Sequence, residues 1–189
     1  MSPFFTIKKS KYFMKHFILV ICTLIFLTAC SDAVPIPVLR GEIPIRVSSD
    51  NPALTAYNYY GLDERNDRQE LKDYTGVDPV RTEWCAAFVN SVLNESGILG
   101  SESVSDVPLM ARSFLKWGQP VIKEDIQPGD LVIFPRGNQG WQGHVGFYLQ
   151  TLVKDGIEYY LILGGNQSNK VSIELFRASK ALDIRRKII

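Results

Sequence analysis

The sequence predicts an α+β fold in which helices come first and an antiparallel sheet follows. Apolar residues recur at helical spacing in the first part of the chain, at 52–60 and 82–93. After residue 128 the period changes to the alternation that is typical of strands, with turn residues between the segments. Strands are expected at 131–134, 144–149, 159–163, 171–176 and 182–186. We therefore expect N-terminal helices packed on an antiparallel sheet of about five or six strands.

Residues 1–29 have the pattern of a bacterial export signal. Four lysines precede an apolar run from Phe17 to Leu27, which is too short to span a membrane as a helix. The run ends in Leu-Thr-Ala-Cys at 27–30, which resembles the lipoprotein box in which Cys30 is acylated and becomes the new N-terminus. An ordinary secretory signal with an incidental cysteine is the alternative. Met1 and Met14 are both suitable starts.

Removal of this signal changes the charge and the set of reactive side chains. Four of the 21 basic residues lie in it, which leaves 17 against 20 acidic residues and a net charge of −3. A basic excess that would indicate a nucleic-acid partner is therefore missing. The remaining thiols are Cys30 and Cys85, the remaining histidine is His144, and no zinc-ligand spacing occurs. An exported protein with one free thiol has either buried it or uses its chemistry.

Residues 30–50 are predicted to be a lipidated N-terminus and flexible tether, because they contain three prolines and no helical period. Residues 51–189 remain, which is a normal size for one domain with its own core. Asn51-Pro52 is expected to open the first helix, since proline is favoured at the first helical position. A charged stretch with few apolar residues follows at 63–72.

The segment 82–93 is predicted to be a helix with a cysteine in its first turn. Thr82 is the expected N-cap and Gly97 the expected stop. Cys85 would lie on the apolar face that also contains Phe88 and Val92. A thiol at a helix start feels the positive end of the helix dipole, which favours the thiolate. An inert thiol packed in the core is the alternative, because free cysteine is commonly buried.

Two polar residues stand out on the predicted strands. After a loop at 100–106, a short helix at 109–117 and a Pro-Gly-Asp turn at 128–130, His144 opens a strand and shares a face with Gly146. The next strand ends in Gly-Gly-Asn-Gln at 164–167, where two glycines permit a backbone that aims Asn166 back at its neighbour. A satisfied histidine and an ordinary turn asparagine are the alternatives.

Four motifs together resemble the papain-like cell-wall hydrolases, namely the CHAP (cysteine, histidine-dependent amidohydrolase/peptidase) and NlpC-type enzymes. They are Trp-Cys-Ala-Ala-Phe-Val-Asn at 84–90, Pro-Gly-Asp-Leu-Val at 128–132, Gly-His-Val-Gly-Phe-Tyr at 143–148 and Gly-Gly-Asn-Gln at 164–167. The resemblance covers about residues 52–186 and implies a papain-like fold. It further implies that Cys85 is the nucleophile, that His144 is the base and that Asn166 orients the histidine, with Asp130 and Gln167 as alternatives for the last role.

One departure from this pattern concerns the residues around the cysteine. The NlpC-type pattern usually carries Asp-Cys-Ser, whereas this chain has Trp84-Cys85-Ala86. The match is therefore closer to the CHAP-like branch, and the residue that would assist the oxyanion hole stays open. Trp84, Trp141 and Gln142 are candidate walls of a substrate groove, with packing beneath a loop as the alternative.

A Cys-His-Asn site of this kind predicts a cysteine peptidase or amidase that acts through a thioester, with no metal or cofactor. Location and resemblance indicate peptidoglycan stem peptides as substrate, and the amide bond that is cut stays open. We expect a monomer on the periplasmic side of the envelope, lipid-anchored through Cys30, with Ser31 favouring the outer membrane. A non-catalytic envelope-binding lipoprotein and a same-fold acyltransferase or toxin amidase are the alternatives.

Overall fold

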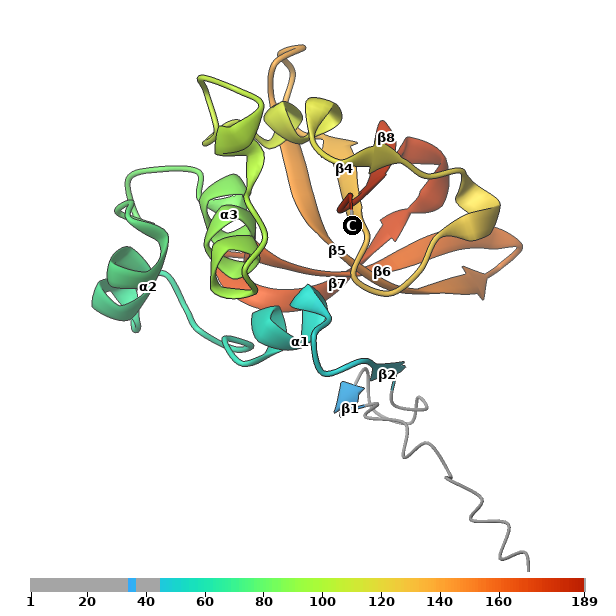
Figure 1. Cartoon of the computed structure of the whole chain (residues 1–189), viewed down its shortest axis with the longest axis horizontal. Coiled ribbons are helices and arrows are strands. Elements are labelled where there is room, and N and C mark those ends of the chain that lie inside the picture. Colours follow the sequence, from blue (N-terminus) through green and yellow to red (C-terminus); the bar gives the residue numbers. More distant parts are fainter. Residues whose placement is uncertain (1–33, 37–44, 189) are drawn as a thin grey trace, which may run out of the picture. The chain divides into compact units, whose positions relative to one another are not determined.

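Alternating apolar residues in the second half of the chain form the central sheet. The computed structural model describes residues 34–36 and 45–188. Its six-stranded sheet has the order β3-β8-β4-β5-β6-β7, and every neighbouring pair is antiparallel (Figure 1). The strands are β3 (Gln119–Pro120), β4 (Leu131–Pro135), β5 (Gly143–Lys154), β6 (Ile157–Gln167), β7 (Lys170–Arg177) and β8 (Asp183–Arg186). The predicted α+β class is confirmed, and the arrangement is consistent with a papain-like fold.

The helices precede the sheet in the chain, as the change of period predicts. The α-helices are α1 (Pro52–Tyr57), α2 (Arg68–Thr75) and α3 (Cys85–Glu95). Asn51 caps α1 by accepting a hydrogen bond from the Ala53 backbone N–H, and proline occupies the first turn as expected. Short 3₁₀ helices follow at η1 (Ser101–Ser103), η2 (Ala111–Lys116), η3 (Lys123–Asp125) and η4 (Ala178–Lys180).

Helix α3 is the helix with the most complete burial. Its predicted apolar face is buried, and so are Ala86, Ala87 and Leu93 on its other sides. The predicted stop is confirmed, because Gly97 adopts φ 71° and the Ile98 N–H reaches back to the Leu93 carbonyl. The predicted start is wrong: Trp84, not Thr82, is the N-cap, and no side chain caps it. The three residues before Cys85 are therefore outside the helix.

Each face of the sheet carries its own apolar cluster. Odd-numbered residues of the central strands, such as Val145, Phe147 and Leu163, pack with α1 and α3. Even-numbered residues, such as Tyr148 and Ile162, form a second cluster on the opposite face. Because side chains alternate along a strand, this division decides which residues reach the start of α3.

Part of the predicted tether is folded instead. Strands β1 (Val34–Ile36) and β2 (Ile45–Val47) form a two-stranded antiparallel sheet. Ile36, Ile45 and Val47 are buried and belong to the apolar cluster that contains α1 and α3. The prediction of a flexible tether is wrong for these segments, because burial of branched apolar side chains stabilises extended chain despite the prolines.

The predicted signal 1–29, the lipidation site Cys30 and the alternative start Met14 lie outside the described residues. Within the residues that are described, none of the helices has both the length and the apolar character needed to cross a membrane.

Candidate active site

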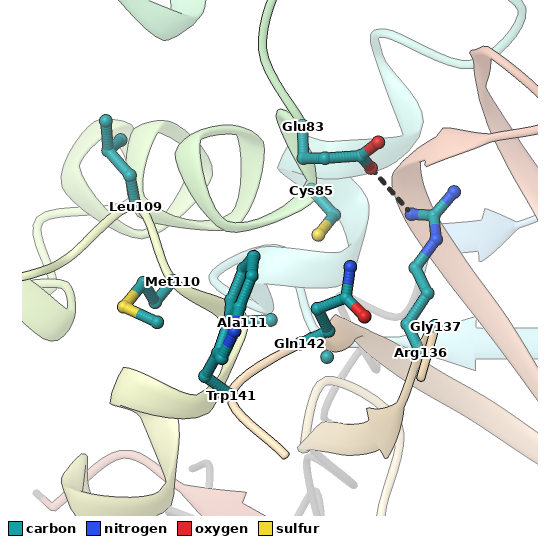
Figure 2. A pocket seen from close by; sticks show the side chains of 10 residues that line it. Glu83, Cys85, Leu109, Met110, Ala111, Arg136, Gly137, Trp141 and Gln142 are labelled. Carbon is teal, nitrogen blue, oxygen red and sulfur yellow. Dashed lines mark ion pairs between the residues drawn. The ribbon is translucent and has the colours of Figure 1, made fainter. Parts of the chain in front are cut away.

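Cys85 lies at the first position of α3 and lines a surface cavity of about 340 Å³. Its side chain is nearly covered, with 3% of the residue exposed. Figure 2 shows the sulfur directed toward Trp141 and Gln142, with Met110 to one side and the Glu83–Arg136 ion pair to the other. The thiol thus borders an open space although it belongs to the packed face of the helix.

The surroundings of the thiol favour its neutral form. Burial raises the pKa of Cys85, and this effect outweighs the backbone N–H of Val145 and the charge of Arg136, which lower it. The expectation that the helix start would favour the thiolate is therefore wrong for this arrangement of the site. Burial removes the sulfur from water, and this destabilises the thiolate by more than the dipole at the start of α3 stabilises it.

His144 lies near the start of β5 in a closely packed position. It pairs across the sheet with Phe134 and stacks on Phe176, with ring centroids 5.2 Å apart and an interplanar angle of 11°. Its Nε2 lies 2.9 Å from Oε1 of Gln167, whereas its buried Nδ1 has no hydrogen-bond partner among the described residues. Burial lowers the pKa of His144 to about 4. The imidazole is therefore neutral at neutral pH.

The hydrogen bonds of Gln167 determine the tautomer of His144. The Gln167 side-chain Nε2 donates to the backbone carbonyls of Ser172, at 2.7 Å, and Ile162, at 3.2 Å. Carbonyls only accept, so the amide is oriented with Oε1 toward the imidazole. His144 must then donate from Nε2, which leaves Nδ1 as its basic nitrogen.

Asn166 forms no hydrogen bond with His144, whose Nε2 lies against Gln167 instead, so the prediction that it orients the imidazole is wrong. Its side-chain Nδ2 donates to Oε2 of Glu83 at 2.7 Å. The β5–β6 register, extended past Phe147 and Leu163, would place Asn166 opposite His144. A bulge between Gly164 and Gln167, with Asn166 at φ 56°, inserts one residue and brings Gln167 to that position. Gln167, named above only as an alternative, is the residue that holds the ring.

Asp130, the other alternative, is already paired. Its two carboxylate oxygens accept hydrogen bonds from Nε and Nη2 of Arg186, both at 2.7 Å. It also accepts from the backbone N–H of Gln127. Asp130 therefore connects the turn before β4 to β8 and does not act on His144.

The two glycines before Asn166 make this arrangement sterically possible. A Cβ on Gly165 would lie 2.6 Å from Cζ3 of Trp84 and 2.7 Å from Cβ of Phe88. A Cβ on Gly164 would lie 2.9 Å from Oε1 of Gln167. Gly165 thus permits the end of β6 to contact the start of α3, and Gly164 leaves room for the amide that holds His144.

The three predicted groove residues have different roles. Trp141, with 60% of its surface exposed, and Gln142 both line the cavity beside Cys85 (Figure 2). Gln142 also organises its own loop, since its Oε1 accepts from the backbone N–H groups of Asn138 and Gln139. Trp84 is fully buried against Phe88 and does not line the cavity, so its prediction as a groove wall is wrong. It is a core residue beneath the site.

Glu83 and Arg136 are site residues that the sequence reasoning missed. Nη1 of Arg136 lies 3.4 Å from Oε2 of Glu83, and Nη2 donates to the backbone carbonyl of Asn166 at 3.2 Å. Arg136 lines both the cavity of Cys85 and a smaller one beside His144. A glutamate two residues before the cysteine was the available signal, but its partner comes from the end of another strand.

Cys85 and His144 lie on different faces of the sheet: Cys85 belongs to the cluster of α3, whereas His144 lies with Phe134 and Phe176 on the opposite face. The backbone N–H of Val145, the residue after His144, acts to lower the pKa of the Cys85 thiol. The charge of Arg136 acts on both side chains. Nδ1 of His144, however, does not hydrogen-bond the sulfur. The structure therefore contains a thiol, a neutral imidazole and the amide that orients it, with the thiol and the imidazole in separate cavities.

No family model and no curated protein matches this chain. Among solved structures, the chain is similar to the P60 domain of an antigen from M. avium paratuberculosis, with a TM-score of 0.37 and 14% sequence identity. The similarity covers 65% of this chain and 97% of that domain. A similarity at this level leaves the function to be argued from the residues themselves.

Proposed function

We propose that the protein is a cysteine hydrolase of the cell envelope that cleaves amide bonds in peptidoglycan stem peptides. The observation that carries the proposal is the state of His144, which Gln167 holds through Nε2 and which keeps a buried, unpartnered Nδ1. A base with one nitrogen fixed and the other free is what nucleophilic catalysis by a thiol requires. Cys85 supplies that thiol at the edge of an open cavity.

The proposed reaction begins from a neutral pair. Nδ1 of His144 takes the Cys85 proton as the sulfur attacks the amide carbon, which forms an S–C bond and a tetrahedral oxyanion. Collapse of the oxyanion breaks the C–N bond, and the imidazolium returns the proton to the leaving amine. Water then attacks the thioester with His144 as base, which releases the acid and restores the thiol. Because the pKa of Cys85 is raised and that of His144 lowered, proton transfer must accompany the attack.

The backbone N–H of Cys85 is the proposed oxyanion donor. It belongs to the first turn of α3, where N–H groups lack partners within the helix. Loss of one oxyanion donor typically raises the barrier by about 3 kcal/mol. The proposed reaction requires a rearrangement of the site on substrate binding, since no hydrogen bond joins Cys85 and His144 in the described residues and the two lie on different faces of the sheet.

The substrate and the location rest on the sequence. Residues 1–30 have the pattern of a lipoprotein signal with acylation at Cys30, which would anchor the protein at the membrane surface facing the wall. Peptidoglycan is the amide-rich polymer at that place. We propose the outer membrane, on its periplasmic side, as the residence of the protein.

The test is the digestion of purified sacculi by the full chain in detergent under reducing conditions, read by mass spectrometry of the released fragments. Wild type should release peptide fragments, and Cys85→Ala should release none. His144→Ala should be nearly as inactive, because the two residues act as one unit. Identical fragment profiles for wild type and Cys85→Ala would refute hydrolysis.

A non-catalytic envelope-binding lipoprotein is the second candidate, and the state of Cys85 favours it. Cys85 is nearly covered, its pKa is raised, and it has no hydrogen bond to His144. Alkylation of the folded protein by iodoacetamide separates the two readings. If the protein is a hydrolase, a small amount of sacculi fragments, too little to cover most of the sites, should speed the alkylation of Cys85. Substrate binding would then bring His144 to the thiol and favour the thiolate. A thiol that reacts only after unfolding would support the binding role.

A further inference from the structure

Among the described residues that line the cavity of Cys85, Arg136 is the only one with a positive charge. The other charged residue lining this cavity is Glu83, and the remaining walls come mainly from Leu109, Met110 and Trp141 (Figure 2). A single guanidinium among apolar and aromatic walls is a site for one negative charge on a partly apolar molecule.

The ion pair between Arg136 and its present partner, Glu83, is weak. The ion pair with Glu83 has an N–O distance of 3.4 Å, and the side chains are 41% and 77% exposed for Arg136 and Glu83. Exposed pairs of this kind contribute little to stability, because water and salt compete for both charges. Glu83 can therefore leave the guanidinium at small cost.

The backbone around Arg136, in contrast, is firmly positioned. Arg136 directly follows β4, and its Nη2 donates to the carbonyl of Asn166 on the bulge that places Gln167. The next residue, Gly137, has φ 66°, and a Cβ there would lie 2.1 Å from Oε1 of Gln142. The guanidinium of Arg136 is thus held in place by the backbone beside the thiol, whereas its ion-pair partner, Glu83, can be exchanged.

We infer that Arg136 forms a carboxylate subsite: the guanidinium exchanges Glu83 for a free carboxylate of the acyl donor, close to the scissile amide. The inference rests on the proposed function for its substrate and names the substrate class more narrowly, as peptides with an unblocked carboxylate near the cleaved bond. The planar fork of arginine matches a carboxylate with two parallel hydrogen bonds, which an amidated substrate cannot accept in the same way. Glu83 occupies the subsite in the free protein.

The experiment compares soluble disaccharide peptides released from sacculi with the same peptides after carbodiimide conversion of their carboxylates to carboxamides. Binding is measured by calorimetry on full-length Cys85→Ala, and turnover on the wild type. The free-carboxylate form should bind about tenfold more tightly or better, since a hydrogen bond to a charged group is lost on amidation. Arg136→Gln, placed in the Cys85→Ala background for binding, should remove this preference, and Arg136→Lys should retain part of it.

Glu83→Gln should change the binding of free-carboxylate peptides in the opposite direction to Arg136→Gln, and is therefore the more specific test. It retains an oxygen that accepts from Asn166 but removes the charge that competes for Arg136, so binding of the free-carboxylate peptides should tighten. Arg65→Gln, an exposed arginine outside the cavity, should change nothing. An unchanged preference in Arg136→Gln, or weaker binding in Glu83→Gln, would overturn the subsite. Absence of turnover with the binding preference intact would instead refute the proposed hydrolysis and leave the subsite standing.

Discussion

Nε2 of His144 lies 2.9 Å from Oε1 of Gln167, and the Gln167 amide is held in turn by the backbone of Ser172 and Ile162. Replacement of Gln167 by alanine removes this support and frees the imidazole to change tautomer. We expect turnover to fall by roughly 10²–10⁴-fold, the range that loss of an orienting group or of acid–base catalysis produces. Asn166→Ala, the neighbouring control, should lose much less, because Asn166 contacts Glu83. Equal losses in the two variants would contradict this assignment.

The buried imidazole predicts a stability change with pH. The pKa of His144 is lowered from 6.5 to about 4, so between these values the unfolded chain binds more protons than the folded one. The contribution of the neutral His144 to the free energy of unfolding is therefore complete above pH 6.5. It is lost as the pH falls toward 4, by about 3 kcal/mol in total. Denaturant unfolding of wild type and His144→Gln across this range measures it. The free energies of unfolding of the two proteins should approach each other as the pH falls, and a constant difference between them would contradict the prediction.

Close contact between β6 and α3 predicts a large effect of one methyl group. Gly165→Ala would place a Cβ 2.6 Å from the Trp84 ring, and that ring is fully buried. We expect a loss of about 1–3 kcal/mol in the free energy of unfolding, the usual cost of overpacking a core.

Gly140→Ala is the matched control for this substitution, because a Cβ on Gly140 meets no atom within 4 Å. Its free energy of unfolding should stay within about 0.5 kcal/mol of wild type, as is usual for surface changes. Thermal unfolding of both variants measures the difference. A Gly165→Ala protein as stable as Gly140→Ala would mean that β6 and α3 are further apart than described.

Burial of β1 predicts that the stretch before the first helix stabilises the domain. Ile36 is fully buried in the cluster with α1 and α3, so Ile36→Ala should cost about 2–4 kcal/mol in the free energy of unfolding. Arg46→Ala, at an exposed position on β2, is the control and should have little effect. A true tether would tolerate both substitutions equally, as measured by denaturant unfolding.

Much of the fold could be predicted from the sequence because its signals are local. The period of apolar residues located α3 and the main strands, and Gly97 marked the helix end. Burial of β1 and β2 escaped prediction, since prolines in a short segment indicate a loop until a partner surface is known. Trp84 was misassigned for a related reason: its neighbour Cys85 borders the cavity, but the turn before α3 directs the indole into the core.

By itself the sequence determined the α+β class, the helix that begins near Cys85, and the strand that His144 opens, because helical and strand periods are properties of neighbouring residues. Tertiary structure alone decided which amide holds His144 and which ion pair lies beside Cys85. A single inserted residue at Asn166 exchanges the faces of Asn166 and Gln167, and the strand pattern carries no record of it. Glu83 and Arg136 meet only because the start of α3 and the end of β4 lie at the same cavity.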